Sequence, residues 1–191
     1  GAIHAAPIDG SSRGLLPSWG SGLRGRRGGS SHDIRHEGLA TFRLSPDLSG
    51  YTPERTRALF PEIEDALRAL PGVGGVTSTT VPILSNNNWR NNLTVEGFVA
   101  GPDTDTTASF AAIGMNYFDT LGIPFVGGRD FTTADAEGSP PVAIVNEAFT
   151  RKFNLGANAV GRRMALGAGG DRPLVIQIVG VVGDAKYSQV R

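Results

Sequence analysis

From Gly38 onward, apolar and polar residues follow regular periods that predict short strands and helices. Thr52 is a favourable helix cap and Pro53 suits the first helical position, so a helix should start there. Pro61 should kink this helix, and Pro71-Gly72 should end it. Its apolar face is predicted to consist of Leu59, Ile63, Ala66, Leu67 and Leu70. Extended runs predict strands over 39–44, 73–81, 93–98, 108–113, 142–145 and 174–182.

Shorter elements fill the second half of the chain. A short helix is predicted over 116–121, before Gly122, and the segment 123–131 should be extended and then turned. Asn146 should cap a helix that runs through Phe153. The run 174–182 is the most apolar and is expected to be a central strand. Strands and helices alternate without a strict βαβ rhythm, which predicts an α+β fold with mixed sheets.

The first 35 residues show no such period. They hold eight glycines, six serines and five arginines, and their longest apolar stretch is Leu15-Leu16. That stretch is too short for a signal peptide or a membrane-spanning helix. We therefore expect residues 1–35 to be a leader that is disordered or not native to the protein, followed by a folded domain over 36–191.

The amino-acid composition limits the classes of function and the kinds of site that the chain can have. The chain has 18 basic and 18 acidic side chains, but residues 1–35 carry a formal +3 and the rest −3. A neutral total implies no general attraction to nucleic acid or anionic membranes. There is no cysteine, and the histidines are all early in the chain: His4, His32 and His36. The folded part thus lacks the usual catalytic triads and nearly every zinc site, and we predict no enzyme activity, metal or cofactor.

Two glycine-rich patterns are candidate binding sites. Residues 20–25 match G-x-G-x-x-G but lack a preceding strand and a following helix, so composition explains them. Gly127-Gly128-Arg129-Asp130, with Asp135 and Glu137, could bind an anion or a metal. The favoured interpretation is a tight glycine turn with a surface ion pair, worth at most about 1 kcal/mol.

Asp103-Thr-Asp105-Thr-Thr107 resembles the D-x-D-x-T nucleophile loop of haloacid-dehalogenase-type phosphatases. In that family, the first Asp attacks phosphorus and the second acts as acid/base beside magnesium, and Asp184 could stand in for the downstream metal-binding acid. The buried apolar strand before the loop and the second downstream acid are missing here. A solvated linker is favoured, and a magnesium-dependent phosphatase is kept as an alternative function.

Residues 85–92 are predicted to form a polar loop that carries Trp89 and Arg90. Two interpretations stay open for this loop. It could be a partner-binding tip, or Trp89 could fold back over the sheet, which is the more common arrangement.

The order of motifs from residue 38 to 191 resembles the MacB-like periplasmic core domain of ABC transporter permeases, especially duplicated permeases with FtsX-like membrane segments. The resembling motifs are Gly50-Tyr-Thr-Pro53, Leu70-Pro-Gly-Val73, Val95-Glu-Gly97, Tyr117-Phe-Asp-Thr-Leu-Gly-Ile-Pro124, Gly127-Gly-Arg-Asp-Phe131, Val142-Ala-Ile-Val-Asn-Glu-Ala148, Val160-Gly-Arg162 and Ile178-Val-Gly-Val-Val-Gly-Asp184. Each motif is weak alone, but their shared order is specific.

The resemblance implies a function without a catalytic site. It places the domain at the periplasmic face of the bacterial cytoplasmic membrane, between two transmembrane helices, where it relays ATP-driven helix motion to substrate or partner proteins. The implied partners are an ABC ATP-binding subunit, a second permease half and a periplasmic protein. The family's domain continues further, so we expect a truncation at Arg191. A stand-alone extracytoplasmic interaction module is the remaining alternative.

Overall fold

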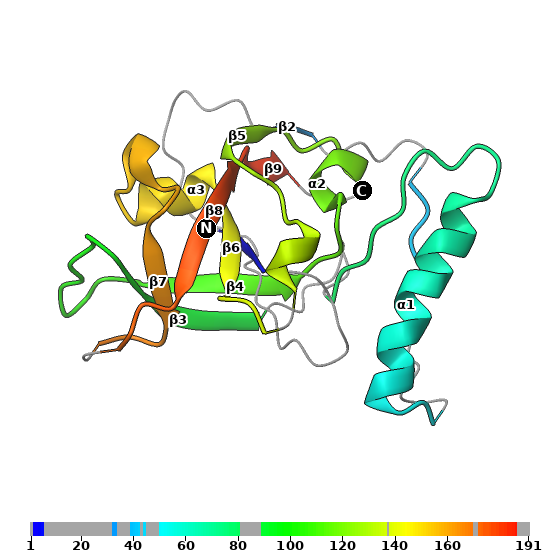
Figure 1. Cartoon of the computed structure of the whole chain (residues 1–191). Helices are drawn as coiled ribbons and strands as arrows, with labels where there is room; N and C mark the ends of the chain where they lie inside the picture. Colours follow the sequence, from blue (N-terminus) through cyan, green and yellow to red (C-terminus); the bar gives the residue numbers. More distant parts are fainter. Residues whose placement is uncertain are drawn as a thin grey trace.

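The computed structural model of the chain describes residues 2–5, 32–33, 39–42, 44, 50–80, 89–136, 138–169 and 172–186. A seven-stranded mixed sheet dominates this part of the protein (Figure 1), with strand order β5-β8-β6-β1-β4-β3-β7. The strands are β1 (Ala2–Ala5), β3 (Trp89–Val95), β4 (Thr107–Ala112), β5 (Phe125–Gly128), β6 (Val142–Asn146), β7 (Arg163–Leu166) and β8 (Ile176–Val182). A separate parallel pair joins β2 (His32–Asp33) to β9 (Ala185–Lys186).

The sheet closes on itself because β8 is paired on both edges. One edge runs parallel to β6 over Gln177–Val182, and β7 pairs with the opposite edge at Ile176 and Gln177. Further along that second edge, β5 pairs antiparallel with β8 between Gly180 and Val182. Six strands, β8-β6-β1-β4-β3-β7, therefore form a barrel, and β5 extends its upper rim in Figure 1. The predicted α+β class with mixed strand directions is confirmed.

The helices begin and end close to where the sequence places them. Helix α1 (Pro53–Arg68) starts after Thr52, whose hydroxyl accepts a hydrogen bond from the Arg55 N–H at 3.3 Å. The shorter helices are α2 (Tyr117–Thr120) and α3 (Glu147–Lys152), with 3-10 turns η2 (Thr133–Asp135) and η3 (Gly156–Asn158). The predicted cap of α3 is confirmed, since the side chain of Asn146 accepts from the Phe149 N–H at 3.0 Å.

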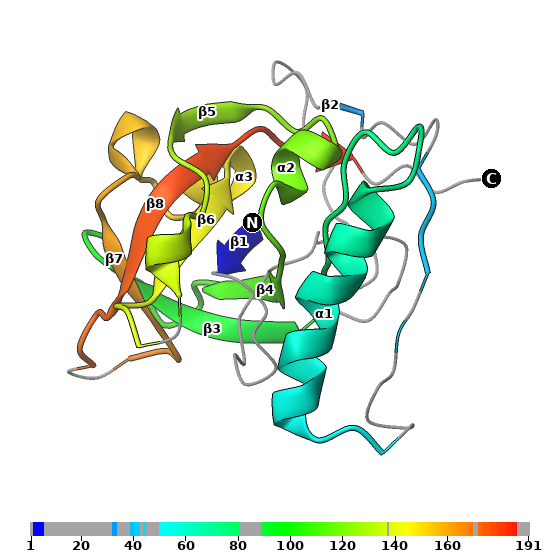
Figure 2. The same ribbon diagram turned by 45° about the vertical axis from the view of Figure 1, so that its right-hand side comes forward.

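The hydrophobic core lies within the barrel and under α2 and α3, whereas α1 lies to one side (Figure 2). The largest fully buried side chains include Phe110, Phe118, Phe149 and Phe153. No described side chain of α1 belongs to the core cluster, although the helix has a half-buried apolar side. A polar contact also holds α1, since the Ser78 hydroxyl donates to Glu64 at 2.6 Å. No helix in the described ranges is long and apolar enough to cross a membrane.

Three predicted segments differ from the structure. Residues 39–42 and 44 are not in a strand, and residues 73–80 contribute only an isolated bridge between Thr79 and Ile113. Trp89 to Asn92, expected in a loop, form the first half of β3 because they pair with β4 from Phe110 to Thr107. The predictions missed β7, a four-residue strand in which only three apolar residues follow the exposed Arg163.

Within the segment predicted to be a leader that is disordered or not native, Ala2–Ala5 are in a strand. This segment forms β1 between β4 and β6, parallel to the first and antiparallel to the second. Four residues are too few to show a period in the sequence, and only their two partner strands define their conformation. The rest of the predicted leader lies outside the described residues, except for β2.

Candidate functional site

A polar cluster ties helix α3 to the end of β8. Asp184 follows β8, and its carboxylate accepts hydrogen bonds from the Asn146 side-chain amide at 2.7 Å and from the Ala148 N–H at 2.8 Å. The guanidinium of Arg151 forms an ion pair with the same carboxylate. A negative charge at the start of a helix is favourable, because the first N–H groups have no partner within the helix. Asp184 therefore anchors the first turn of α3.

The other end of α3 is tied to the start of β4. The ammonium of Lys152 donates to Asp105 at 2.7 Å and to the Thr107 carbonyl at 2.6 Å. The hydrogen bond from Lys152, followed by that from the Thr107 N–H, holds the pKa of Asp105 well below its usual range. We call Asp105, Asn146, Arg151, Lys152 and Asp184 the α3 clamp. It links two barrel strands, β4 and β8, through one short helix.

The contacts of the acidic residues differ from those expected for the phosphatase alternative. Asp105 is in an ion pair with Lys152 and Asp184 is surrounded by three donors, so neither carboxylate is placed as a free nucleophile or metal ligand. Asp103 is exposed on the linker before β4. Among the described residues, no three His, Cys, Asp or Glu side chains lie close enough to hold a metal ion. The linker interpretation of residues 101–107 agrees better with these contacts.

The glycine turn after β5 contains a bidentate ion pair between Arg129 and Asp135. Arg129 donates to both carboxylate oxygens of Asp135, at 2.7 and 2.9 Å, and Thr132 adds its N–H and hydroxyl to one of them. These contacts, the Arg129 bonds first, lower the pKa of Asp135 to about 2. The pair was expected at the surface, but the Asp135 side chain is only 6% exposed. It therefore fixes the turn rather than offering a free anion or cation site.

The Asp130 carboxylate, another member of the predicted glycine-turn site, makes a separate contact. It accepts from the Phe131 N–H at 2.7 Å, and partial burial raises the pKa of this carboxyl. Glu137 lies outside the described residues, as does the G-x-G-x-x-G pattern over 20–25.

Trp89 and Arg90 lie at the open end of β3. Both are exposed, and Trp89 keeps 48% of its surface accessible. On one side they pair with β4, opposite Phe110 and Ser109. The other side of β3 pairs with β7 only from Leu93 to Val95, so β7 ends before it reaches them. About half of the Trp89 surface is therefore covered. This is intermediate between the two predicted arrangements, an exposed partner-binding tip and a tryptophan folded back over the sheet.

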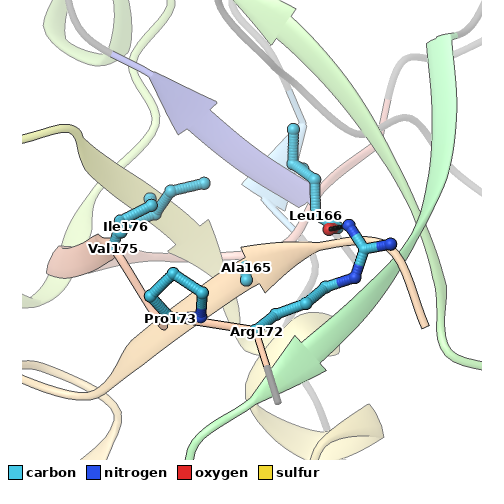
Figure 3. A pocket seen from close by; sticks show the side chains of 6 residues that line it. All are labelled: Ala165, Leu166, Arg172, Pro173, Val175 and Ile176. Carbon is cyan, nitrogen blue, oxygen red and sulfur yellow. Dashed lines mark hydrogen bonds between the residues drawn. The ribbon is translucent and has the colours of Figure 1, made fainter. Parts of the chain in front are cut away.

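A pocket of about 290 Å³ lies beside the same edge, where β7 ends and β8 begins (Figure 3). Its lining is mostly apolar: Ala165, Leu166, Arg172, Pro173, Val175 and Ile176. The Arg172 guanidinium donates to the Leu166 carbonyl at 3.3 Å. No sequence pattern pointed to these residues, because they come from two strands and the turn between them.

The chain resembles a known family over most of its length. The sequence profile of the family described as the MacB-like periplasmic core domain matches residues 18–190, and this match begins inside the predicted leader. Comparison with curated proteins gave no match.

Two solved structures are similar over part of their length. The periplasmic region of MacB from Actinobacillus actinomycetemcomitans shares 23% identity at a TM-score of 0.41, covering 65% of this chain and 50% of that one. A domain of a protein described as a permease, from Porphyromonas gingivalis, shares 18% identity at a TM-score of 0.42, covering 68% and 48%. The chain therefore spans about half the length of these structures.

The family match covers most of the chain and includes every strand of the barrel except β1. It also agrees with the order of motifs that suggested the resemblance. The chain belongs to the family of MacB-like periplasmic core domains.

Proposed function

We propose that this chain is the extracytoplasmic domain of an ABC transporter permease, and that it relays ATP-driven movement of the membrane helices to a substrate or partner protein. It has no catalytic site in this proposal. ATP is hydrolysed by a separate ATP-binding subunit, and a second permease half completes the transporter at the bacterial cytoplasmic membrane. Membership of the MacB-like family supports this function.

The α3 clamp carries the mechanical part of the proposal. A domain that transmits movement must resist deformation between its input and its output. Here the barrel is closed by continuous strand pairing, and the α3 clamp joins β4 to β8 from outside. Packed interiors also transmit strain with little compression. Movement applied to one strand is thus passed to the whole barrel.

The test uses the full-length permease assembled with its ATP-binding subunit. Spin labels are attached at Val99→Cys in this domain, which has no cysteine of its own, and at an exposed cysteine introduced in the other permease half, after any cysteines elsewhere in the assembly are replaced. Val99 is 93% exposed. We expect the distance distribution between the two labels to change when ADP is replaced by ATP. A distribution that is the same with both nucleotides would refute the relay.

A matched control measures distances within one domain. One label is placed at Val99→Cys, in a loop, and the other at Val126→Cys, on β5. Both side chains are exposed. If the barrel moves as one body, this distance stays constant when the nucleotide changes. A changing distance would show that the domain deforms instead of relaying the movement.

We further propose that Trp89 and Arg90 form part of the partner contact. Their exposure beside an incompletely paired strand edge supports this, because aromatic and arginine side chains are enriched at interfaces. A photo-crosslinking residue at position 89 of the full-length permease should capture a defined protein, and a crosslinker at position 126 should not. Equal capture from both positions, or none from 89, would contradict this assignment.

A further inference from the structure

The start of strand β3 is paired on only one edge among the described residues. Trp89 to Asn92 pair with β4, and the Leu93 N–H continues this pairing to the Thr106 carbonyl at 3.1 Å. Successive residues of an antiparallel strand direct their backbone groups to alternate sides. The N–H and C=O of Arg90 therefore point to the other edge, where β7 pairs only with Leu93 to Val95.

A glycine turn ends the pairing with β7 just before Arg90. The Gly167 N–H donates to the Asn92 carbonyl at 2.7 Å, which is the last contact of this kind along the described edge. Gly167 has φ +97°, a conformation that turns the backbone away from the line of an extended strand. Within the described residues, the line of β7 is therefore unfilled beside Arg90.

The charged side chains around this edge are positive. β3, β4 and β7 carry two charged side chains between them, and both are exposed arginines, Arg90 and Arg163. The Arg90 guanidinium has no hydrogen bond or ion pair with a described residue. The acids nearest to these strands in the sequence, Glu96 and Asp105, are each already in an ion pair. The edge is therefore complementary to a partner that brings negative charge.

A second copy of this chain matches the edge poorly. If two β3 edges paired about a two-fold axis near Arg90, the Arg90 side chains of both copies would lie close together. Like charges opposite one another destabilise a strand pair. The edge thus favours a different polypeptide over self-association.

We propose that the start of β3 binds an extended segment of the partner protein as an added strand. The segment pairs with the N–H and C=O of Arg90, as in other cases of strand addition to an open sheet edge. Because side chains alternate between the two faces of a strand, Trp89 and Arg90 lie on opposite faces. The matching segment therefore alternates apolar residues, next to Trp89, with acidic residues, next to Arg90. This inference rests on the proposed partner contact and specifies its chemistry.

The first test measures hydrogen exchange in this chain with a synthetic peptide of alternating valine and glutamate, about eight residues long. At saturating peptide, the Arg90 amide should exchange at least about tenfold more slowly than without peptide. The neighbouring Asn91 amide is the control, because its backbone groups already face β4 and its exchange should not change. Unchanged exchange of the Arg90 amide would overturn strand addition.

The second test reverses the charge at the edge. In Trp19→Phe, Trp89 is the sole tryptophan, so its fluorescence reports peptide binding. Arg90→Glu in this background should weaken binding of the valine–glutamate peptide at least about tenfold and favour a valine–lysine peptide instead. Arg163→Glu, on β7 and away from the open edge, is the matched control and should have little effect. Equal binding of both peptides to the parent chain would overturn the preference for acidic segments.

These measurements need neither nucleotide nor membrane helices, so their failure is distinct from a failure of the relay. They are also distinct from the photo-crosslinking at position 89. Capture of a protein there, with no protection of the Arg90 amide by the acidic peptide, would keep the partner contact and refute strand addition. Protection of that amide, with no capture from position 89, would support strand addition at this edge and refute the partner contact.

Discussion

Arg129 and Asp135 form a bidentate ion pair that closes the turn after β5, with donor–acceptor distances of 2.7 and 2.9 Å. The carboxylate is buried, whereas the guanidinium is about half exposed. Such pairs are stronger than single-contact surface ion pairs because both oxygens are held in a fixed geometry. The turn also depends on Gly128, which precedes Arg129 and has a positive φ.

Asp135→Asn should lower the free energy of unfolding at neutral pH by about 1–2 kcal/mol. The folded-state pKa of Asp135 is about 2, below its ordinary value of 3.8. A lowered pKa contributes stability above 3.8, and this contribution is lost as the pH falls towards 2. Denaturant unfolding at several pH values measures the effect.

The difference in the free energy of unfolding between the parent and Asp135→Asn reports on Asp135 alone. Other acids, including Asp105, whose pKa is also lowered, are present in both proteins and cancel. The stability gap between parent and Asp135→Asn should shrink as the pH is lowered through this window. A gap that is the same at pH values well above and below the window would show that the charge of Asp135 is unimportant.

Gly128→Ala should destabilise the protein by at least about 2 kcal/mol. Gly128 has φ +76°, and a Cβ there would lie 2.2 Å from the Val179 carbonyl oxygen on β8. A Cβ added at the neighbouring Gly127 would meet no atom within 4 Å, and the φ of Gly127 is not positive. Gly127→Ala is therefore the matched control and should change the melting temperature little. Equal effects of the two substitutions would contradict this account.

Asp184→Ala should cost about 2–4 kcal/mol, because it leaves the Asn146 amide and the Ala148 N–H without their acceptor. Arg151→Ala should cost less than about 1 kcal/mol, since its side chain is mostly exposed. Thermal unfolding of both variants tests the difference. The α3 clamp would be wrongly assigned if Arg151→Ala were the more damaging of the two.

Phe153→Ala should lower the free energy of unfolding by about 3–5 kcal/mol. The ring is fully buried and packs against Phe98 and Phe149, with centroids 5.1 and 4.5 Å away. Val99→Ala, next to Phe98 but almost fully exposed, should stay within about 0.5 kcal/mol of the parent. Chemical denaturation of both variants provides the comparison.

Elements that carry their own signals were predicted well. Thr52-Pro53 and Asn146 mark helix starts by side-chain chemistry that acts over three residues, and both caps are present. The apolar run of β8 exceeds what one exposed face allows, so its central position followed from composition alone. The order of family motifs also identified the family that the profile confirms.

Elements and sites that depend on distant partners were not predicted. Residues 39–44 have the apolar pattern of a strand, but residues 39–42 and 44 have no partner strand in the structure. Lys152 and Asp105 lie 47 positions apart, and Arg151 and Asp184 lie 33 apart, so no local spacing indicated the α3 clamp. Asp135 was considered with Arg129, but its burial comes from the surrounding fold.

The sequence by itself determined the helix starts, the most apolar strand, the mixed α+β class and the family. These depend on short-range hydrogen bonding, on side-chain periodicity and on motif order, which are all present before the chain folds. Only the tertiary structure decided that the sheet closes into a barrel, that β1 pairs between β4 and β6, and that α3 joins β4 to β8. The reason is that strand pairing and ion pairs between remote residues are selected by what each segment buries once the others are in place.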